Sequence, residues 1–96
     1  MLFDNINKGI EEYKNTEGAV LVDVREADEF EAGHIPGAVN LPLSKIQSIS
    51  FDKNVTLFLY CLRGSRSMRA ASILKKMGYL HVKSIGGIKG YKGALE

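Results

Sequence analysis

The sequence predicts an α/β fold with a mostly parallel central sheet. Short runs rich in β-branched residues alternate along the chain with segments whose apolar residues recur at helical spacing. The runs at 19–24 and 55–60 are apolar almost throughout, which is typical of strands buried on both faces of a parallel sheet. A chain of 96 residues is long enough for one core, so we expect a single domain over residues 1–96.

The N-terminal segment is expected to form a helix over about residues 5–15. One apolar stripe runs along it through Ile6, Ile10 and Tyr13. Asp4 is placed to cap its first turn, because a side-chain oxygen there can accept hydrogen bonds from free backbone N–H groups.

Three shorter elements are expected in the middle of the chain. A strand at 19–24 is followed by a short helix at 26–32, with Phe30 facing inward. Gly33 ends this helix, because glycine tolerates the backbone conformation found just after a helix. A turn-rich connection then leads to a brief strand at 39–41.

The next segment leads to the only cysteine of the chain. Ser44 and Gln47 have the spacing of a capping box, which predicts the start of another short helix. The strand at 55–60 then delivers Cys61 to a loop, and a helical pattern begins near Ser67.

The C-terminal part completes the alternation. Gly78 stands where a glycine commonly ends a helix, and a last strand is expected at 81–85. Gly86 and Gly87 are expected to break this strand. Residues 88–96 favour a final helix only weakly, because two further glycines interrupt it.

Composition and spacing argue against several classes of function. The formal net charge of +2, without a long basic run, is too small to indicate a nucleic-acid partner. No apolar run is long enough to cross a membrane, and residues 1–5 lack the pattern of a signal peptide. A single cysteine cannot form an internal disulfide, which fits a reducing compartment, so we expect a cytoplasmic protein. His34 and His81 have no metal-ligand spacing to Cys61, so neither a metal nor another cofactor is expected.

The stretch Cys61–Ser67 carries the chemistry that we expect. A helix that opens directly after a loop presents backbone N–H groups without intrahelical partners, and these groups and the helix dipole favour negative charge. Arg63 and Arg66 add positive charge at the same place. A thiol there ionises more readily, because the field stabilises the thiolate. We therefore predict that Cys61 is a nucleophile in an anion-binding loop, although a free cysteine is often only a small buried hydrophobe.

Two longer signatures resemble those of single-domain rhodaneses, which are sulfurtransferases. The first consists of DVRE at 23–26, EF at 29–30 and GHIPGAVNLP at 33–42. The second is YCLRGSRS at 60–67 with the helix that follows, and a weaker third match is GGI at 86–88. The resemblance implies a three-layer α/β/α arrangement around a mostly parallel sheet of four to five strands.

The resemblance also implies a reaction. Cys61 would accept a sulfane sulfur from thiosulfate or a persulfide donor, become a persulfide, and hand the sulfur to cyanide or a thiol. The implied partners are a small anionic sulfur donor and a thiol or cyanide acceptor. A thioredoxin-like or sulfur-carrier protein is compatible with the acceptor role.

The loop is expected to bind the anion through its backbone, because the N–H groups of a concave turn converge on its centre. The residues expected to supply these groups are Leu62, Arg63, Gly64, Ser65 and Arg66. Gly64 permits the sharp curve that such a loop needs. Arg63 is expected to face the anionic group of the donor, unless it is only a solvated loop arginine.

Other polar residues are expected to support the loop rather than react. Asp23 and Arg25 emerge at the carboxyl end of a strand, where they can pair with each other or with a neighbouring loop. Glu29 is a second candidate partner for Arg25. Ser67 can add a hydroxyl donor or cap the helix, and His34 is expected to bond to backbone within its turn.

Loop length separates two enzyme classes. Cys61 and Arg66 are spaced as Cys-x4-Arg, whereas cysteine phosphatases of similar appearance use Cys-x5-Arg around a tetrahedral phosphate. The shorter loop suits one additional sulfur atom, so sulfur transfer is favoured over a cysteine-dependent phosphatase. A non-catalytic binding or regulatory module on the same fold is the other alternative, because fold does not fix function.

Overall fold

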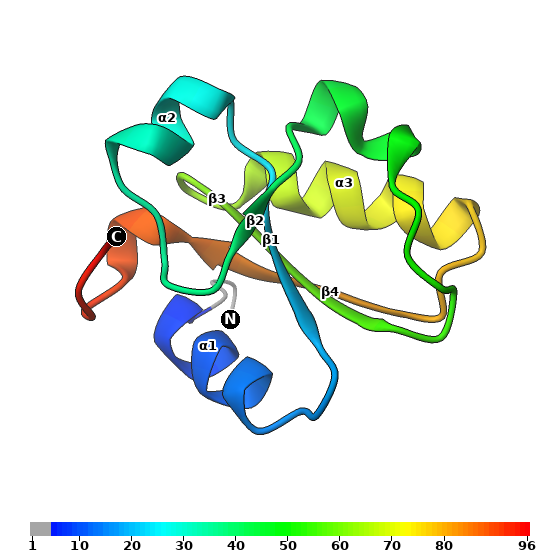
Figure 1. The fold of residues 1–96 in the computed structure, drawn as a ribbon, viewed down its shortest axis with the longest axis horizontal. Helices are drawn as coiled ribbons and strands as arrows, with labels where there is room; N and C mark the ends of the chain where they lie inside the picture. The colour runs from blue at the N-terminus through cyan, green and yellow to red at the C-terminus, as the bar shows by residue number, and fades with distance from the viewer. Residues whose placement is uncertain (1–4) are drawn as a thin grey trace.

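The computed structural model describes residues 5–96 as a parallel sheet between helices (Figure 1). The first helix, α1, spans Ile6–Lys14. Its cap is Asn5, whose side-chain oxygen accepts hydrogen bonds from two backbone N–H groups of the first turn. This cap stands one position later than the predicted one. The predicted cap, Asp4, lies outside the described residues.

The described residues form a four-stranded sheet in which every neighbouring pair is parallel, in the order β2-β1-β3-β4. The strands are β1 (Val20–Asp23), β2 (Val39–Asn40), β3 (Thr56–Cys61) and β4 (His81–Gly87). The predicted α/β fold with a parallel sheet of four to five strands is confirmed.

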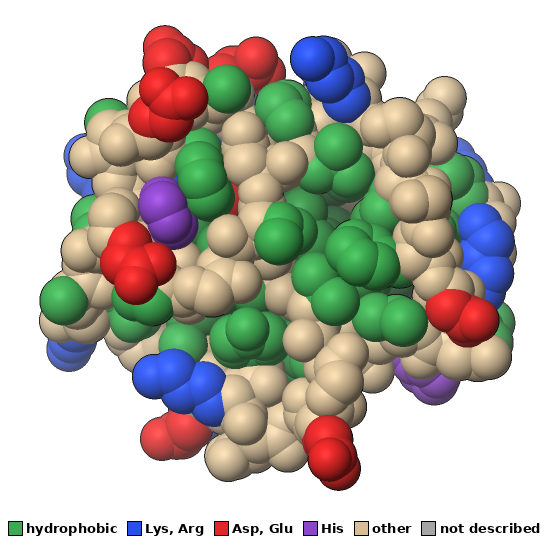
Figure 2. All heavy atoms as spheres, in the orientation of Figure 1, with side chains coloured by type: hydrophobic (Ala, Val, Ile, Leu, Met, Phe, Trp, Pro, Cys, Tyr) green, Lys and Arg blue, Asp and Glu red, His purple; other side chains and the backbone are tan. Residues whose placement is uncertain are grey.

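Helices cover both faces of this sheet, as a three-layer arrangement requires. α1 packs against one face, and α3 (Ser65–Lys76) covers the other face together with the 3-10 helix η1 (Leu43–Ser48). The short helix α2 (Ala27–Ala32) follows β1, and Figure 1 shows it near the carboxyl ends of β1 and β3. Figure 2 shows acidic side chains gathered over α2.

The side chains of β3 alternate between two buried cores. Leu57, Leu59 and Cys61 belong to the core beneath α3, whereas Phe58 and Tyr60 belong to the core beneath α1. Successive side chains of a strand point to opposite faces of a sheet, so this alternation decides which helix the cysteine meets. The sulfur therefore lies on the α3 face, below the start of that helix.

α3 begins two residues earlier than expected and ends where expected. Its first residue is Ser65 rather than Ser67, because Gly64 takes the N-cap position with a φ of 115°. Glycine adopts this left-handed conformation without a steric penalty. At the other end Gly78 has a φ of 102°, and the N–H groups of Gly78 and Tyr79 bond to carbonyls of the last turn.

The expected capping box at the start of η1 is wrong. Ser44 and Gln47 do not cap the helix, because the N-cap position falls on Pro42. The proline side chain has no oxygen that could accept a hydrogen bond from the first turn. The element is a 3-10 helix over its whole length.

The expected break at Gly86 and Gly87 is also wrong, because β4 runs through Gly87. A register shift lets Gly87 pair with Cys61 of β3. A Cβ on Gly87 would lie 2.5 Å from the Cα of Arg63 and would meet the carbonyl oxygen of Leu62. The glycine thus allows β4 to pass directly against the cysteine loop.

Residues 88–96 do not form the expected final helix. They contain one 3-10 turn, η2 (Ile88–Gly90), followed by a tail without regular secondary structure. The backbone of Glu96 exchanges two hydrogen bonds with that of His34, at 2.8 and 3.0 Å. Pairing with a distant loop therefore replaces local helix formation at this end.

Candidate functional site

Cys61 is the last residue of β3, and only 1% of it is exposed. Its Sγ accepts a hydrogen bond from the backbone N–H of Gly64 at 3.0 Å and a longer one from that of Ser67 at 3.4 Å. The hydroxyl of Ser67 lies 3.7 Å from the same sulfur. Two backbone donors therefore converge on the sulfur at the N-terminus of α3, where the helix dipole also favours negative charge.

The sequence left open whether Cys61 is a nucleophile in an anion-binding loop or a small buried hydrophobe, and its environment has features of both. The residue belongs to the apolar core beneath α3, yet two amides point at its sulfur. Of the five residues expected to supply loop amides, only Gly64 donates to Sγ within the described part of the chain. The roles of the other four toward a bound anion stay predictions; these residues are Leu62, Arg63, Ser65 and Arg66.

Ser67 connects the cysteine loop to β4. Its side chain is fully buried, and its hydroxyl donates to the carbonyl of Gly64 at 3.0 Å. The same hydroxyl lies 2.7 Å from the hydroxyl of Ser84, which is 17 residues farther along the chain. Sequence reasoning missed Ser84, because only the sheet register brings it beside the loop.

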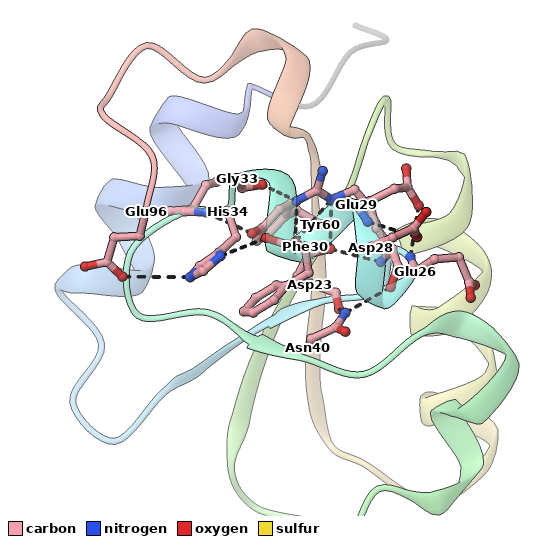
Figure 3. Close-up of polar contacts among 12 residues, drawn as sticks. Asp23, Glu26, Asp28, Glu29, Phe30, Gly33, His34, Asn40, Tyr60 and Glu96 are labelled. Atoms are coloured by element: carbon pink, nitrogen blue, oxygen red, sulfur yellow. Dashed lines mark hydrogen bonds and ion pairs between the residues drawn. The ribbon is translucent and has the colours of Figure 1, made fainter.

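Arg66, the last residue of the loop motif, is turned toward α2. Its guanidinium donates two hydrogen bonds to the carboxylate of Glu29, at 2.8 and 3.1 Å. The hydrogen bond from Arg66 lowers the pKa of Glu29 from 4.5 to about 2. Glu29 thus pairs with Arg66 and not with Arg25, which corrects the pairing suggested by the sequence. The ion pair ties α2 to the first turn of α3, and Figure 3 shows Glu29 within the polar network at this edge.

Asp23 and Arg25 form an ion pair with each other, one of the two arrangements that the sequence allowed. Nη2 of Arg25 lies 2.7 Å from Oδ2 of Asp23, and both side chains are buried. The same Nη2 donates to the carbonyl of Gly33 at 2.7 Å. Figure 3 labels the two acceptors, Asp23 and Gly33. Burial alone would lower the pKa of Arg25, but the hydrogen bond to Asp23 and its charge raise it above the ordinary value. The pair therefore fastens both ends of the segment that carries α2.

Two residues to which sequence reasoning gave no role complete this network. Asn40, at the end of β2, donates from Nδ2 to the carbonyls of Asp23 at 3.0 Å and Arg25 at 2.9 Å. The hydroxyl of Tyr60 accepts a hydrogen bond from the backbone N–H of Ile35 at 3.1 Å. Burial raises the pKa of Tyr60 well above its ordinary value, so the hydroxyl stays protonated. The sequence feature that could have indicated Asn40 and Tyr60 is a polar group near the carboxyl end of a predicted strand.

Arg63 and His34 differ in their contacts. Arg63 is exposed and has no ion-pair partner among residues 5–96, so its expected contact with a donor stays a prediction. His34 bonds to backbone as expected, because its Nδ1 lies 2.9 Å from the carbonyl oxygen of Phe30. The two rings stack with their centroids 3.8 Å apart. Phe30 is therefore half-buried against His34 and does not reach either core.

The polar groups at this edge of the sheet include a thiol, two backbone donors directed at it, and two arginine–carboxylate pairs. Such an arrangement can stabilise a charged sulfur or a small anion. No cluster of three or more His, Cys, Asp or Glu side chains in the described part of the chain is arranged to hold a metal. In the same residues, no helix has the length and apolar character needed to cross a membrane.

Comparison with known proteins places this geometry in a family. The family model of the rhodanese-like domain matches residues 6–94. The chain belongs to the rhodanese-like family. The match confirms the resemblance that the two sequence signatures indicated.

Individual members of the rhodanese-like family agree with this assignment. The thiosulfate sulfurtransferase PspE of Escherichia coli (strain K12) is 39% identical over 72 residues, which cover 71% of this chain and 69% of PspE. The thiosulfate sulfurtransferase GlpE of Pseudomonas savastanoi pv. phaseolicola is 38% identical over 73 residues, covering 74% of this chain and 69% of GlpE. A solved structure described as a rhodanese with anions from E. coli has a TM-score of 0.72 and 34% identity, covering 81% of this chain and 96% of that one. These similarities confirm the prediction of a rhodanese-type sulfurtransferase.

Proposed function

We propose that this protein moves a sulfane sulfur from thiosulfate or a persulfide donor to cyanide or a thiol, through a persulfide on Cys61. The observation that carries the proposal is the pair of backbone N–H groups, from Gly64 and Ser67, directed at Sγ. These donors belong to a tight turn and to the first turn of a helix. They can therefore stabilise a thiolate without rearranging first, which is how fixed dipoles contribute most to catalysis.

In the proposed first half-reaction, the thiolate of Cys61 attacks the outer sulfur of thiosulfate. A bond forms between Sγ and this sulfur, while the bond to the sulfite sulfur breaks and its electron pair leaves with sulfite. The transferred sulfur then lies one bond farther out than Sγ, where the amides of Leu62, Ser65 and Arg66 are proposed to bind it. The guanidinium of Arg63, which has no ion-pair partner among residues 5–96, is proposed to meet the charge of the donor. The related E. coli structure, described with anions, supports an anionic substrate.

In the second half-reaction, the acceptor attacks the outer sulfur of the persulfide. The bond between the two sulfurs breaks, and its electron pair returns to Cys61, which leaves as a thiolate. Cyanide would give thiocyanate and a thiol would give a persulfide. A thioredoxin-like or sulfur-carrier protein is a proposed acceptor. The cytoplasm is the proposed location, because the reaction needs the free thiol of Cys61.

Three further residues are proposed to keep the loop in its reactive shape. Asp23 and Arg25 hold the start and end of the segment around α2 through their ion pair and the bond to Gly33. Ser67 holds the turn through its hydroxyl bond to Gly64. A misplaced loop would lose rate even with its cysteine intact, because small errors in the position of catalytic groups are costly.

Intact mass spectrometry tests the proposal directly. Incubation with thiosulfate is expected to add the mass of one sulfur atom to the wild type, and cyanide is expected to remove it with release of thiocyanate. Cys61→Ser should show neither change. Ser72→Ala, an exposed substitution on the outer side of α3, is the matched control and should behave like the wild type. Thiocyanate formation at the wild-type rate by Cys61→Ser would rule the mechanism out.

The burial of Cys61 favours one other candidate, a non-catalytic binding or regulatory module, because a sequestered thiol is what such a module would contain. That candidate expects no added sulfur and no accelerated alkylation of the thiol at neutral pH. A cysteine-dependent phosphatase would instead cleave an aryl phosphate and lose this activity on Cys61→Ser. Absence of turnover at high protein concentration would dismiss the phosphatase.

A further inference from the structure

Ser84 lies behind the nucleophile, on β4 and outside the loop that carries the proposed reaction. It is opposite Leu59 in the sheet register, and its hydroxyl is 2.7 Å from that of Ser67. Ser67 in turn lies 3.7 Å from Sγ of Cys61. Sulfur and two hydroxyls therefore form a short polar chain at the end of the apolar core beneath α3.

The hydrogen bonds of Ser67 indicate which hydroxyl is the donor when Cys61 is a thiol. A serine hydroxyl has one proton and two acceptor lone pairs. The proton of Ser67 is donated to the carbonyl of Gly64 at 3.0 Å, and one lone pair accepts the S–H of Cys61. The contact between the two hydroxyls can run in either direction, and with the Ser67 proton on the Gly64 carbonyl it is Ser84 that donates to the second lone pair.

Ionisation of Cys61 changes this arrangement. The S–H bond breaks, its proton passes to solvent, and a charged acceptor replaces a donor beside Ser67. The hydroxyl proton of Ser67 can then rotate from the carbonyl of Gly64 to the sulfur. That carbonyl keeps a partner, because the backbone N–H of Met68 donates to it at 3.1 Å. The rotation leaves no buried group without a hydrogen bond, and a charged acceptor forms the stronger bond.

We infer that Ser84 is a positioning residue that stabilises the thiolate of Cys61 by donating a hydrogen bond to Ser67. A hydroxyl that accepts one hydrogen bond becomes a better donor, because the bonds in a chain polarise one another. When Ser84 donates to Ser67, it does not accept a hydrogen bond from Ser67, so the hydroxyl proton of Ser67 stays available to the sulfur. The relevance to catalysis rests on the proposed function, but the effect concerns ionisation of the thiol and not transfer of sulfur.

The rate of alkylation by iodoacetamide, measured as a function of pH, tests this role. The chain has one cysteine, so the rate reports Cys61 alone. Ser67→Ala is expected to move the midpoint of the profile upward by about one pH unit, and Ser84→Ala by about half a unit. Ser84→Thr keeps the hydroxyl on a side chain suited to a strand, so it should restore the wild-type midpoint. Ser72→Ala is the control and should leave the profile unchanged.

A double substitution shows whether Ser84 acts through Ser67. In the Ser67→Ala background, Ser84→Ala should add no further shift. An unchanged midpoint in Ser84→Ala overturns the inference, and so does a shift of equal size in Ser84→Ala and Ser84→Thr. The mass measurement on the wild type keeps the two proposals apart. If the wild type forms a persulfide but Ser84→Ala leaves the alkylation profile unchanged, only the role of Ser84 is overturned. If Ser84→Ala moves the profile but the wild type forms no persulfide, only the proposed sulfur transfer is overturned.

Discussion

Replacing Gly87 with alanine is expected to displace the cysteine loop. A Cβ at this position would lie 2.5 Å from the Cα of Arg63 and 2.7 Å from the carbonyl carbon of Leu62. Real Cβ atoms stay at least 3.0 Å from such neighbours, so the Cα of Arg63 would have to move by about 0.5 Å or more. These neighbours are backbone atoms, which cannot rotate away as the end of a flexible side chain can.

The expected losses of stability and of rate depend on which contacts this displacement disturbs. It would stretch the hydrogen bond from the N–H of Lys89 to the carbonyl of Leu62, now 3.1 Å long, and it would move the residue next to Cys61. Overpacking of this kind costs about 1–3 kcal/mol of unfolding free energy. A shift of about 1 Å in a catalytic group can lower a rate about 100-fold, so we expect persulfide formation to slow by at least roughly 10-fold.

Two measurements on a matched pair of variants test this expectation. Gly90→Ala is the control, because among the described residues its Cβ would meet only Cγ2 of Ile6, at an ordinary 3.6 Å. Urea unfolding reports the change in stability, and the rate at which thiosulfate adds one sulfur reports the change at the loop. If Gly87→Ala matches Gly90→Ala in both measurements, the steric reasoning is wrong.

Two other substitutions test the contacts around α2. Because pairing with Arg66 lowers the pKa of Glu29 from 4.5 to about 2, the pair stabilises the fold above pH 4.5, and this contribution is lost as the pH falls through 2. Glu29→Gln should therefore be less stable than the wild type near neutral pH and equally stable at the acid end of a urea series; a difference that does not change with pH would contradict the pairing. Asn40→Ala removes the bonds to the carbonyls of Asp23 and Arg25, so thermal or urea unfolding should show a loss of about 1–2 kcal/mol, and wild-type stability would show that these bonds contribute nothing.

The backbone elements around Cys61 could be predicted, because they are formed by segments that are adjacent in the sequence. An apolar run, a glycine and a helical pattern follow one another directly in the sequence, so chain order alone places Cys61 between a strand and a helix N-terminus. The turn glycine, Gly64, also follows from the need for a positive φ. The alternation of side chains along β3 then decides the face on which the sulfur lies.

The partners of individual side chains were not predictable, because they depend on how distant segments pack. Glu29 is near two arginines, and Arg25 is already occupied by Asp23 and the carbonyl of Gly33. Only the position of α2 over the loop shows that Arg66 is the partner. Ser84 gave no signal for the same reason, since a serine within a strand is chemically ordinary until the register is known.

The place of β3 in the sheet has a consequence for how activity is lost on heating. The strand is hydrogen-bonded on both sides, to β1 and to β4. A central strand of this kind exchanges its amide protons only through openings that approach global unfolding. Deuterium exchange at residues 57–60 should therefore be among the slowest in the molecule. Heat inactivation should coincide with the cooperative melting transition, because Cys61, the proposed nucleophile, is attached to the last part of the fold to open.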